Sequence, residues 1–419
     1  MNFGNHGSSP RLVPPVPRKT PGGAVPAPSS EAQTAQPTIE EDRLTGAVPQ
    51  RLIQHGGLAG AAPRLLAALA DAGSASEASA VVSRHGRSLW REAIRRLREG
   101  DGDDRPLYWA RLELARAVRG WRPDFPVDTG ELLGVLGRES RGIGLNGLPA
   151  GPDRLRVVVT GFDPFGLDSD VRRGNPSGAA ALALHGTVVR TDCGRSAHIE
   201  AVVLPVRWRD FTDGVVEQAL RPYLEPGPRQ VHLFMTVSQG RPGVFDIERH
   251  NAGWRGEGAD NLKETAPGPV PPVPGADGVP NPPWTAGTLP HAEMAAAATG
   301  PHPVRGNPAV TEVPAGGGEP VVREAGPTAG SSARAGGGGD YLSNEVAYRA
   351  TLLRDRVAAG VPGGHLHTPV LRFAEENASE ASGRFTDGTL VGSRMDITAQ
   401  IRSLLAVAAG TLPAGGAAD

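Results

Sequence analysis

Apolar residues follow a helical spacing in the first third of the chain, after a stretch with almost no large apolar side chains. Residues 1–39 are mostly Pro, Gly, Ser and Ala, a composition that predicts a disordered tail. From residue 40 to 125, apolar side chains recur every three or four positions, most clearly in SLWREAIRRLRE (residues 88–99). The pattern predicts a small all-helical region over 40–125 and a linker over 126–153.

From Leu155 onwards the pattern changes to short apolar runs separated by helical segments. LRVVVTGF, HIEAVVLPV and QVHLFMTV are continuous apolar runs, which is typical of strands buried on both faces. NPSGAAALALHG, DFTDGVVEQALRPYL and the segment Tyr341–Val357 have helical character, and GGHLHTPVLRF indicates another strand. This alternation predicts an α/β domain over 154–410, a three-layer α/β/α fold with a mostly parallel or mixed central sheet, followed by a tail over 411–419.

Residues 262–340 interrupt the α/β pattern. They contain APGPVPPVPGADGVPNPP and EVPAGGGEP, in which Pro and Gly are too frequent for a central strand or helix. We therefore expect a long insert at 262–340, either a loop or a subdomain. Long loops within a compact domain are usually functional lids or disordered.

Composition narrows the classes of function. The 419 residues carry a net charge of −2, so no overall basic field favours binding to nucleic acid or anionic lipid. No apolar run of 18 residues predicts a membrane span, and the N-terminus lacks the apolar core of a secretory signal, so a cytoplasmic location is expected. The single cysteine, Cys193, excludes an internal disulfide and a cysteine-based metal cluster, and its place in a predicted turn favours a spectator role.

Two segments place candidate binding residues after predicted strands. VTGFDPFG ends a strand with Phe162 and Phe165, and ligands of open α/β sheets bind at the carboxyl ends of strands. The alternative is that both phenylalanines belong to the core. SQGRPGVFDIERHNAGW follows the strand QVHLFMTV and contains Gln239 and Glu248 among other polar residues. It indicates either a site or an ordinary surface loop.

A third segment could supply a nucleophile. GGGGDYLSNEVAY places Ser343 after four glycines at the start of a predicted helix, where the positive end of the helix dipole would activate a hydroxyl. His367 lies on a predicted strand and could be its general base, with Glu248 orienting the imidazole. Two alternatives stay open at this point: Ser343 could be a structural helix cap, and His365 could replace His367 as the base.

These motifs together resemble a known family. TGFDPFG…NPS, GR…IER…N…DN, YLSNEVAY and GGHLHTP occur in the order found in pyroglutamyl peptidase I, the pyrrolidone-carboxylate peptidases. The resemblance covers about residues 155–410 apart from the insert, and the first 150 residues have no counterpart in that family. It implies a peptide hydrolase that needs no cofactor or metal, acts on a peptide with an N-terminal pyroglutamate or a similar small molecule, and assembles into a homo-oligomer.

The resemblance also implies roles for individual residues. Glu248 matches the orienting acid and His367 the base, while Ser343 stands where the family has its cysteine nucleophile. Arg255 could correspond to a substrate-binding arginine. The positions matching the substrate pocket are Phe162, Phe165, Asn175 and Gln239.

The serine leaves the type of function open. A hydroxyl is far harder to deprotonate than a thiol and needs a well-placed base and an oxyanion hole. We therefore expect either a hydrolase of the pyroglutamyl-peptidase type or a catalytically inactive member of the fold that binds a small ligand or peptide. A third possibility is that the helical region over 40–125 acts as an interaction module.

Overall fold

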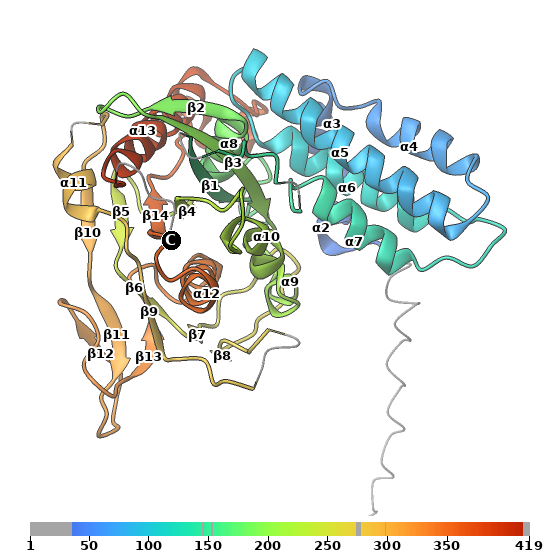
Figure 1. Cartoon of the computed structure of the whole chain (residues 1–419). Helices are drawn as coiled ribbons and strands as arrows, with labels where there is room; N and C mark the ends of the chain where they lie inside the picture. Colours follow the sequence, from blue (N-terminus) through green and yellow to red (C-terminus); the bar gives the residue numbers. More distant parts are fainter. Residues whose placement is uncertain (1–35, 145, 152–153, 274–277, 298, 414–419) are drawn as a thin grey trace, which may run out of the picture.

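A computed structural model describes most of the chain and shows a helical bundle beside an α/β body (Figure 1). Most of the tail predicted to be disordered, residues 1–35, lies outside the described residues, but Thr38 and Ile39 at its end already form the cap and first residue of a helix. The described ranges are 36–144, 146–151, 154–273, 278–297 and 299–413.

The N-terminal bundle is built from amphipathic helices. In α5 the side chain of Ser74 caps the first turn by accepting a hydrogen bond from the backbone N–H of Glu77 at 3.2 Å. The stripe predicted from the apolar spacing, Leu89, Trp90, Ala93, Ile94 and Leu97, is buried in this helix. The helices are α2 (Ile39–Asp42), α3 (Ala47–His55), α4 (Ala61–Ala70), α5 (Ala75–Glu99), α6 (Arg105–Gly120) and α7 (Thr129–Glu139), with a 3₁₀ turn at Arg43–Thr45 after α2.

Helix α7 lies inside the segment 126–153, for which the sequence pattern predicts a linker. Its first turn is capped by Asp128, which accepts a hydrogen bond from the N–H of Glu131, and Leu132 and Leu136 are buried. The helix packs against α5 and α6. Only two large side chains are fully buried along its 11 residues, which is why the periodicity is weak. The boundaries of the domains stay a prediction.

The α/β body is organised around a seven-stranded mixed sheet with strand order β10-β5-β14-β4-β1-β3-β2. Neighbouring strands from β14 to β3, and the pair β10–β5, are parallel, whereas β5–β14 and β2–β3 are antiparallel. The predicted mixed sheet is thus confirmed. Its strands are β1 (Leu155–Phe162), β2 (Thr187–Arg190), β3 (Ser196–Leu204), β4 (Leu233–Gln239), β5 (Phe245–Glu248), β10 (Val304–Asn307) and β14 (Gly363–Thr368).

Helices cover both faces of this sheet. Val157 and Val159 of β1 belong to the core cluster that includes α8 and α13, and Val158 belongs to the cluster that includes α10 and α12. Alternate residues of β1 therefore serve opposite layers, as in a three-layer α/β/α fold. The helices are α8 (Pro176–Leu184), α9 (Trp208–Thr212), α10 (Val215–Leu224), α12 (Leu342–Val357) and α13 (Gly388–Gly410); 3₁₀ turns lie at Glu375–Asn377 and Glu380–Ser382.

One predicted helix is divided in two. The segment DFTDGVVEQALRPYL forms the end of α9 and the whole of α10, because Gly214 adopts a left-handed conformation with φ of 83° between them. An L-residue rarely adopts this conformation, so the glycine permits the break.

The insert at 262–340 holds more regular structure than its Pro and Gly content indicates. One of its strands, β10, extends the edge of the central sheet by pairing with β5. The others form a separate three-stranded antiparallel sheet and pair with two short strands that follow β5 (Figure 1). These elements are β6 (His250–Ala252), β7 (Trp254–Arg255), β8 (Gly268–Pro269), β9 (Trp284–Ala286), α11 (His291–Ala296), β11 (Val310–Val313), β12 (Val321–Arg323) and β13 (Ser332–Ala335).

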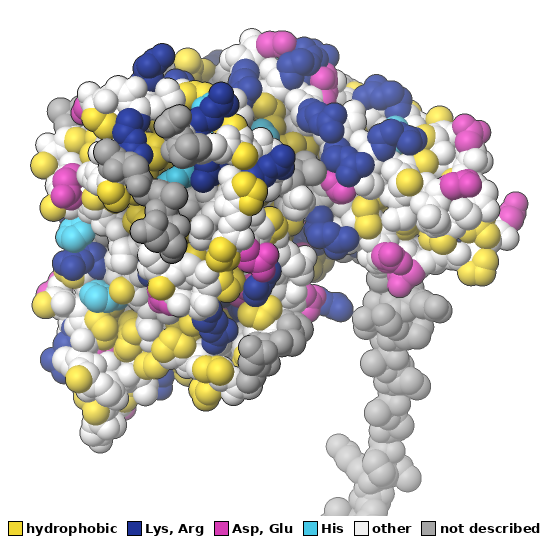
Figure 2. Space-filling model, viewed as in Figure 1, with side chains coloured by type: hydrophobic (Ala, Val, Ile, Leu, Met, Phe, Trp, Pro, Cys, Tyr) yellow, Lys and Arg dark blue, Asp and Glu magenta, His cyan; other side chains and the backbone are white. Residues whose placement is uncertain are grey.

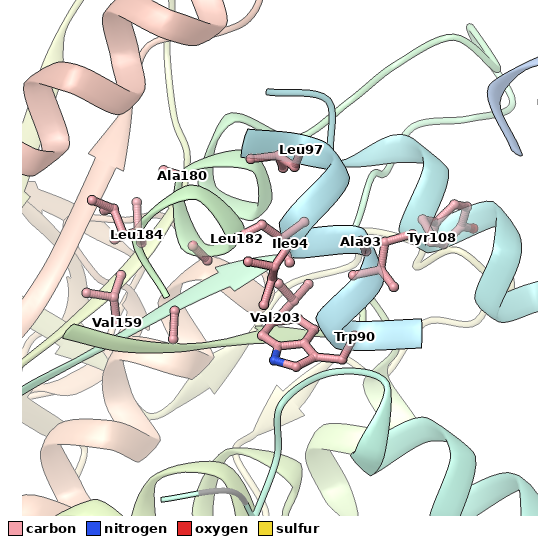
Figure 3. Close-up of a cluster of buried hydrophobic side chains, with 14 of the residues drawn as sticks. Trp90, Ala93, Ile94, Leu97, Tyr108, Val159, Ala180, Leu182, Leu184 and Val203 are labelled. Atoms are coloured by element: carbon pink, nitrogen blue, oxygen red, sulfur yellow. The ribbon is translucent and has the colours of Figure 1, made fainter. Parts of the chain in front are cut away.

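The bundle and the α/β body share one apolar core. Trp90 and Ile94 of α5 lie beside Leu182 of α8 and Val203 of β3 (Figure 3), and all four belong to the same buried cluster. On the outside, basic side chains are spread over both parts on the face shown in Figure 2. No helix among the described residues has both the length and the apolar character needed to cross a membrane.

A buried ionic cluster fastens the bundle to the loop after β1. Asp163 accepts hydrogen bonds from Arg111 of α6, at 2.8 Å, and from Arg141, which follows α7. Burial opposes ionisation of this carboxyl, but the two guanidinium groups lower the pKa of Asp163 below its ordinary value. Since Asp163 lies between Phe162 and Phe165, the bundle fixes the segment that carries both phenylalanines.

A second contact joins the bundle to the start of α8. Asp104, at the start of α6, accepts a hydrogen bond from the backbone N–H of Asn175 at 3.0 Å through Oδ2. Its Oδ1 is buried and has no hydrogen-bond partner among the described residues. Burial, together with the charge of Asp103, raises the pKa of Asp104 to about 7.

Replacing the shared carboxylate should destabilise the whole protein. We expect Asp163→Ala to lower the free energy of unfolding by about 3–5 kcal/mol, because it leaves two buried guanidinium groups without their partner. Urea denaturation measures this. The control is Asp168→Ala, since Asp168 is 54% exposed and pairs with Arg43 at the surface; it should cost no more than about 1 kcal/mol. Equal effects of the two variants would contradict the role of the buried cluster.

Asp104 should make stability depend on pH. Between the ordinary pKa of an aspartate and pH 7, the folded protein retains this proton while the unfolded chain loses it, so the free energy of unfolding falls as the pH rises through this window. The slope from this group is at most about 1.4 kcal/mol per pH unit. Asp104→Asn removes the titration, so the variant should gain stability relative to the parent protein between pH 5 and pH 8. Urea denaturation at both pH values measures the difference in free energy of unfolding between the variant and the parent protein. If this difference is the same at pH 5 and pH 8, the account is wrong.

Candidate functional site

Two strands of the central sheet bring an acid and an imidazole together. β5 runs antiparallel to β14, with Glu248 opposite His365 and Asp246 opposite His367. All four side chains therefore point to one face of the sheet, and Glu248 is the diagonal neighbour of His367. Glu248 Oε1 lies 2.7 Å from Nδ1 of His367, and both side chains are almost completely buried.

The structure also distinguishes the two histidines. His365 is fully buried, with Nδ1 at 2.8 Å from the hydroxyl of Thr236 and Nε2 at 2.8 Å from that of Ser238. Burial and the neighbouring His367 hold the pKa of His365 well below its ordinary value, so this imidazole is neutral. With both of its nitrogens engaged, His365 is not available as a base. His367 is the imidazole that faces the carboxylate.

The four glycines before α12 form a tight turn against this pair. Gly336 and Gly339 exchange backbone hydrogen bonds of 2.8 and 3.0 Å, and Gly339 has φ of 85°. A Cβ atom on Gly337 would lie 2.1 Å from Oε2 of Glu248, and one on Gly338 would lie 2.7 Å from Cε1 of His367. Glycine is needed at both positions because even a methyl group there would overlap the acid or the imidazole.

Ser343 is the second residue of α12 and is half-buried. Its hydroxyl donates a hydrogen bond to the carbonyl oxygen of Gly338 at 3.2 Å. Within the described part of the chain it has no hydrogen bond to His367. Gly338 therefore binds the serine hydroxyl and leaves no room for a side chain beside the imidazole. Glu248 and His367 are thus paired, whereas the hydroxyl of Ser343 is bound to the carbonyl of Gly338 instead of the imidazole.

A small pocket of about 40 Å³ opens beside Ser343. It is lined by residues from the ends of β1 and β4 and from the start of α12, and none of its lining side chains is charged. It brings Ser343 together with all four residues that the sequence predicts for substrate binding. The lining residues are Phe162, Phe165, Asn175, Val206, Ser238, Gln239, Tyr341, Leu342 and Ser343.

The predicted pocket residues differ in how free they are. Phe162 is 3% exposed and stacks on Phe211 at 6.0 Å, so it serves the core and the pocket at once. The amide of Asn175 is engaged in its own loop, since Nδ2 donates to the carbonyl of Asp163 and Oδ1 accepts from Ser177. The side chain of Gln239, in contrast, makes no hydrogen bond to any described residue, which leaves its amide available to a ligand.

Arg255, a candidate from the resemblance, and Cys193, for which the sequence favours a spectator role, lie outside this pocket. Arg255 is held by both carboxylate oxygens of Glu345, each at 2.6 Å, and does not line the pocket. Cys193 is exposed, and the hydroxyl of Thr191 lowers the pKa of its thiol. It does not belong to the pocket either. Over the residues that the structure describes, no group of three or more His, Cys, Asp or Glu side chains could hold a metal ion.

The sequence gives no sign of one residue at this site. Asn307, at the end of β10, donates a hydrogen bond from Nδ2 to Oε2 of Glu248 at 2.8 Å. It lies inside the predicted insert, where no motif marks it. Its position depends on the pairing of β10 with β5, in which Asn307 is in register with Glu248. A pairing of this kind between distant segments cannot be read from one sequence.

The close approach of the turn predicts a sensitive glycine. We expect Gly337→Ala to lower the free energy of unfolding by about 1–3 kcal/mol, because the new methyl group displaces a carboxylate that is buried and hydrogen-bonded. Gly316→Ala is the control, since a Cβ atom there would meet nothing within 4 Å. Urea denaturation of both variants is the measurement. If Gly337→Ala were as stable as Gly316→Ala, the turn would not be packed against Glu248.

Comparisons with known proteins match both parts of the chain. The family model described as PA0049 N-terminal domain matches residues 23–137, and the one described as PA0049, C-terminal domain matches residues 156–281 and 308–372.

Among solved structures, a mutant pyrrolidone carboxyl peptidase from Pyrococcus furiosus is 21% identical, with a TM-score of 0.41 over 62% of this chain and 100% of that one. Pyroglutamyl peptidase I from Bacillus amyloliquefaciens is 19% identical, with a TM-score of 0.39 over 61% of this chain and 97% of that one.

A curated relative covers both parts of the chain at once. It is the uncharacterized protein PA0049 of Pseudomonas aeruginosa, which is 31% identical over 444 residues, 83% of this chain and 80% of the relative. Together with the two family models, this similarity shows that the chain belongs to the PA0049 family.

Proposed function

We propose that this protein is a hydrolase that removes an N-terminal pyroglutamyl group, or a similar small acyl group, from a peptide. Ser343 is the nucleophile, His367 the general base and Glu248 the acid that orients the imidazole. The observation that carries the proposal is the 2.7 Å contact between Glu248 and His367 beside a pocket that contains Ser343. The order of sequence motifs shared with pyroglutamyl peptidase I supports the same assignment.

The chemistry requires one rearrangement. With Nδ1–H donating to Glu248, Nε2 of His367 carries the lone pair that accepts the proton of Ser343. The hydroxyl has to rotate away from the carbonyl of Gly338 to reach it. Its oxygen then attacks the acyl carbon, the C–N bond breaks, and the amine leaves with the proton from His367. Water hydrolyses the resulting ester by the reverse sequence of proton transfers.

The start of α12 can stabilise the oxyanion. Ser343 lies in the first turn of this helix, where backbone N–H groups point outward and the helix dipole is positive. Negative charge that develops on the acyl oxygen is stabilised by such donors. A serine is a weaker nucleophile than the cysteine of the similar peptidases, so it depends more strongly on this contribution and on the base.

The pocket favours an uncharged acyl group. None of its lining side chains is ionisable at neutral pH, and two phenylalanines supply apolar walls. The free amide of Gln239 can both donate to and accept from a lactam or carboxamide. A pyroglutamyl ring has no charged amine and carries one N–H and one carbonyl, so it matches these groups.

A second function is favoured by a specific observation, the hydrogen bond from Ser343 to Gly338. If that bond persists when a ligand is bound, the hydroxyl never reaches the imidazole, and the protein binds small acyl or peptide ligands without cleaving them. Raised thermal stability with pyroglutamyl peptides, in the absence of any turnover, would identify this case.

The test is hydrolysis of a fluorogenic pyroglutamyl amide. We expect Ser343→Ala to reduce kcat by about 10³-fold or more, because the residues of such a triad act as a unit. Ser403→Ala, a serine of α13 outside the pocket, should leave the rate unchanged. Ser343→Cys restores a thiol at the same position. Activity that survives Ser343→Ala would refute the assignment of Ser343 as the nucleophile. Activity found only in Ser343→Cys would favour the second function, a protein that binds its ligand without cleaving it.

A further inference from the structure

The carboxylate of Glu248 is held from two sides by different parts of the chain. Oε1 faces His367, while Oε2 accepts a hydrogen bond from Nδ2 of Asn307 at 2.8 Å. The same Nδ2 donates to the carbonyl oxygen of Gly337 at 3.0 Å. One amide thus connects the acid to the glycine turn that lies against the imidazole.

The orientation of this amide is determined by its surroundings. Both groups facing Nδ2 are acceptors only, a carboxylate and a backbone carbonyl. On the other side, Oδ1 of Asn307 accepts a hydrogen bond from the backbone N–H of Ala309 at 3.3 Å. A flipped amide would turn its oxygen towards the carboxylate and its NH₂ group towards an N–H, so only the observed orientation satisfies every partner.

Asn307 is carried by the insert and not by the segments that resemble the peptidases. β10 pairs in parallel with β5, so that Asn307 stands beside Glu248 in the sheet, and the carbonyl of Asn307 accepts the N–H of Arg249 at 3.0 Å. The match to the C-terminal family model stops at residue 281 and resumes at 308. Asn307 is the last residue of the unmatched segment.

We infer that Asn307 is a positioning residue for the Glu248–His367 pair, an inference that rests on the proposed hydrolase function for its catalytic consequence. The amide fixes the carboxylate in the rotamer that presents Oε1 to the imidazole. Because Asn307 does not line the pocket, it acts on the rate of the chemical step and not on substrate affinity.

Other charged groups near His367 are already paired. Asp246, on the same face of β5, is bound by Arg241 at 2.7 Å and by Arg305 at 2.8 Å. His365 is neutral and engaged by two hydroxyl groups. Among the described residues, Glu248 is therefore the carboxylate that sets the tautomer of His367, and the donor to its second oxygen controls it.

The first readout does not depend on activity. Two-bond ¹H–¹⁵N NMR of the imidazoles, assigned with His367→Gln, reports which ring nitrogen carries the proton. In the parent protein, neutral His367 should be almost entirely the Nδ1–H tautomer. In Asn307→Ala the carboxylate is free to rotate, and the ring should show both tautomers. Asn307→Leu, which keeps the branched shape of the side chain but has no donor, should do the same if the alanine variant folds poorly.

The second readout is kinetic. Asn307→Ala and Asn307→Leu should reduce kcat for the pyroglutamyl amide by about 10-fold or more, with KM unchanged, since a small displacement of a catalytic group lowers the rate strongly. Asn281→Ala is the matched control, because Asn281 is an asparagine of the same insert that donates from Nδ2 to the carbonyl of Val270 at 3.2 Å and does not touch Glu248. It should change neither the tautomer nor kcat.

The outcomes separate the inference from the proposed function. An Nδ1–H tautomer that persists in both Asn307 variants, or that is absent from the parent protein, overturns the positioning role. A tautomer that changes in a protein without amidase activity leaves the positioning role intact and refutes the hydrolase.

Discussion

A charged carboxylate is stable inside a protein only when its oxygens are paired, and the arrangement of this site follows from how that condition is met at Glu248. The side chain is 3% exposed and divides its bonds between His367 and Asn307. The first bond orders the imidazole and the second orders the carboxylate itself. The glycine turn packs against both side chains. It can do so only without a side chain at Gly337, because a Cβ atom there would occupy the space of Oε2. Acid, imidazole and turn are thus one packed unit, to which Ser343 is attached through Gly338.

The helical bundle holds the two segments that line the pocket at the end of β1 and before α8. Arg111 and Arg141 bind Asp163, between the two pocket phenylalanines, and Asp104 receives the N–H of Asn175. Loops that carry binding residues are usually the most mobile parts of an α/β domain. Here a buried ionic cluster and an apolar core shared with the bundle hold them. The bundle therefore contributes directly to the geometry of the pocket.

Much of the fold could be predicted from the sequence, because it depends on local signals. The buried strands are continuous apolar runs, α8 begins directly after its cap Asn175, and the stripe on α5 has helical spacing. The elements that the sequence pattern does not predict lack such local signals. α7 has a short apolar face, and β10, with the sequence VRGN, becomes a strand only because β5 offers it an edge.

The same distinction applies to the candidate site, where recognisable motifs indicate candidate residues whose roles stay a prediction. His365 is distinguished from His367 by its two hydroxyl partners, and Asn307 is found only from the register of β10 with β5. Both observations depend on contacts between segments that are distant in the sequence. The hydroxyl of Ser343 illustrates the limit of sequence reasoning most clearly. Its position at the helix start follows from the motif, but its hydrogen bond to Gly338 follows from the conformation of the turn.

That hydrogen bond matters for the proposed reaction, because a serine and a cysteine lose their protons differently. A thiol can lose its proton to a nearby imidazole and then persist as a thiolate, whereas an alcohol transfers its proton only as the new bond forms. In the proposed mechanism, the hydroxyl must therefore point at Nε2 of His367 at the moment of attack. In the present conformation the carbonyl of Gly338 competes for the same proton. Since Gly337, the residue before it, is tied to Asn307, the turn cannot move away freely, and rotation about the Ser343 side chain is the simplest route to a reactive geometry. An acyl group in the pocket would favour this rotation by bringing an electrophilic carbon next to the oxygen. Under the proposed function, the pocket, the turn and the serine rotamer would thus determine together whether a bound acyl group is cleaved.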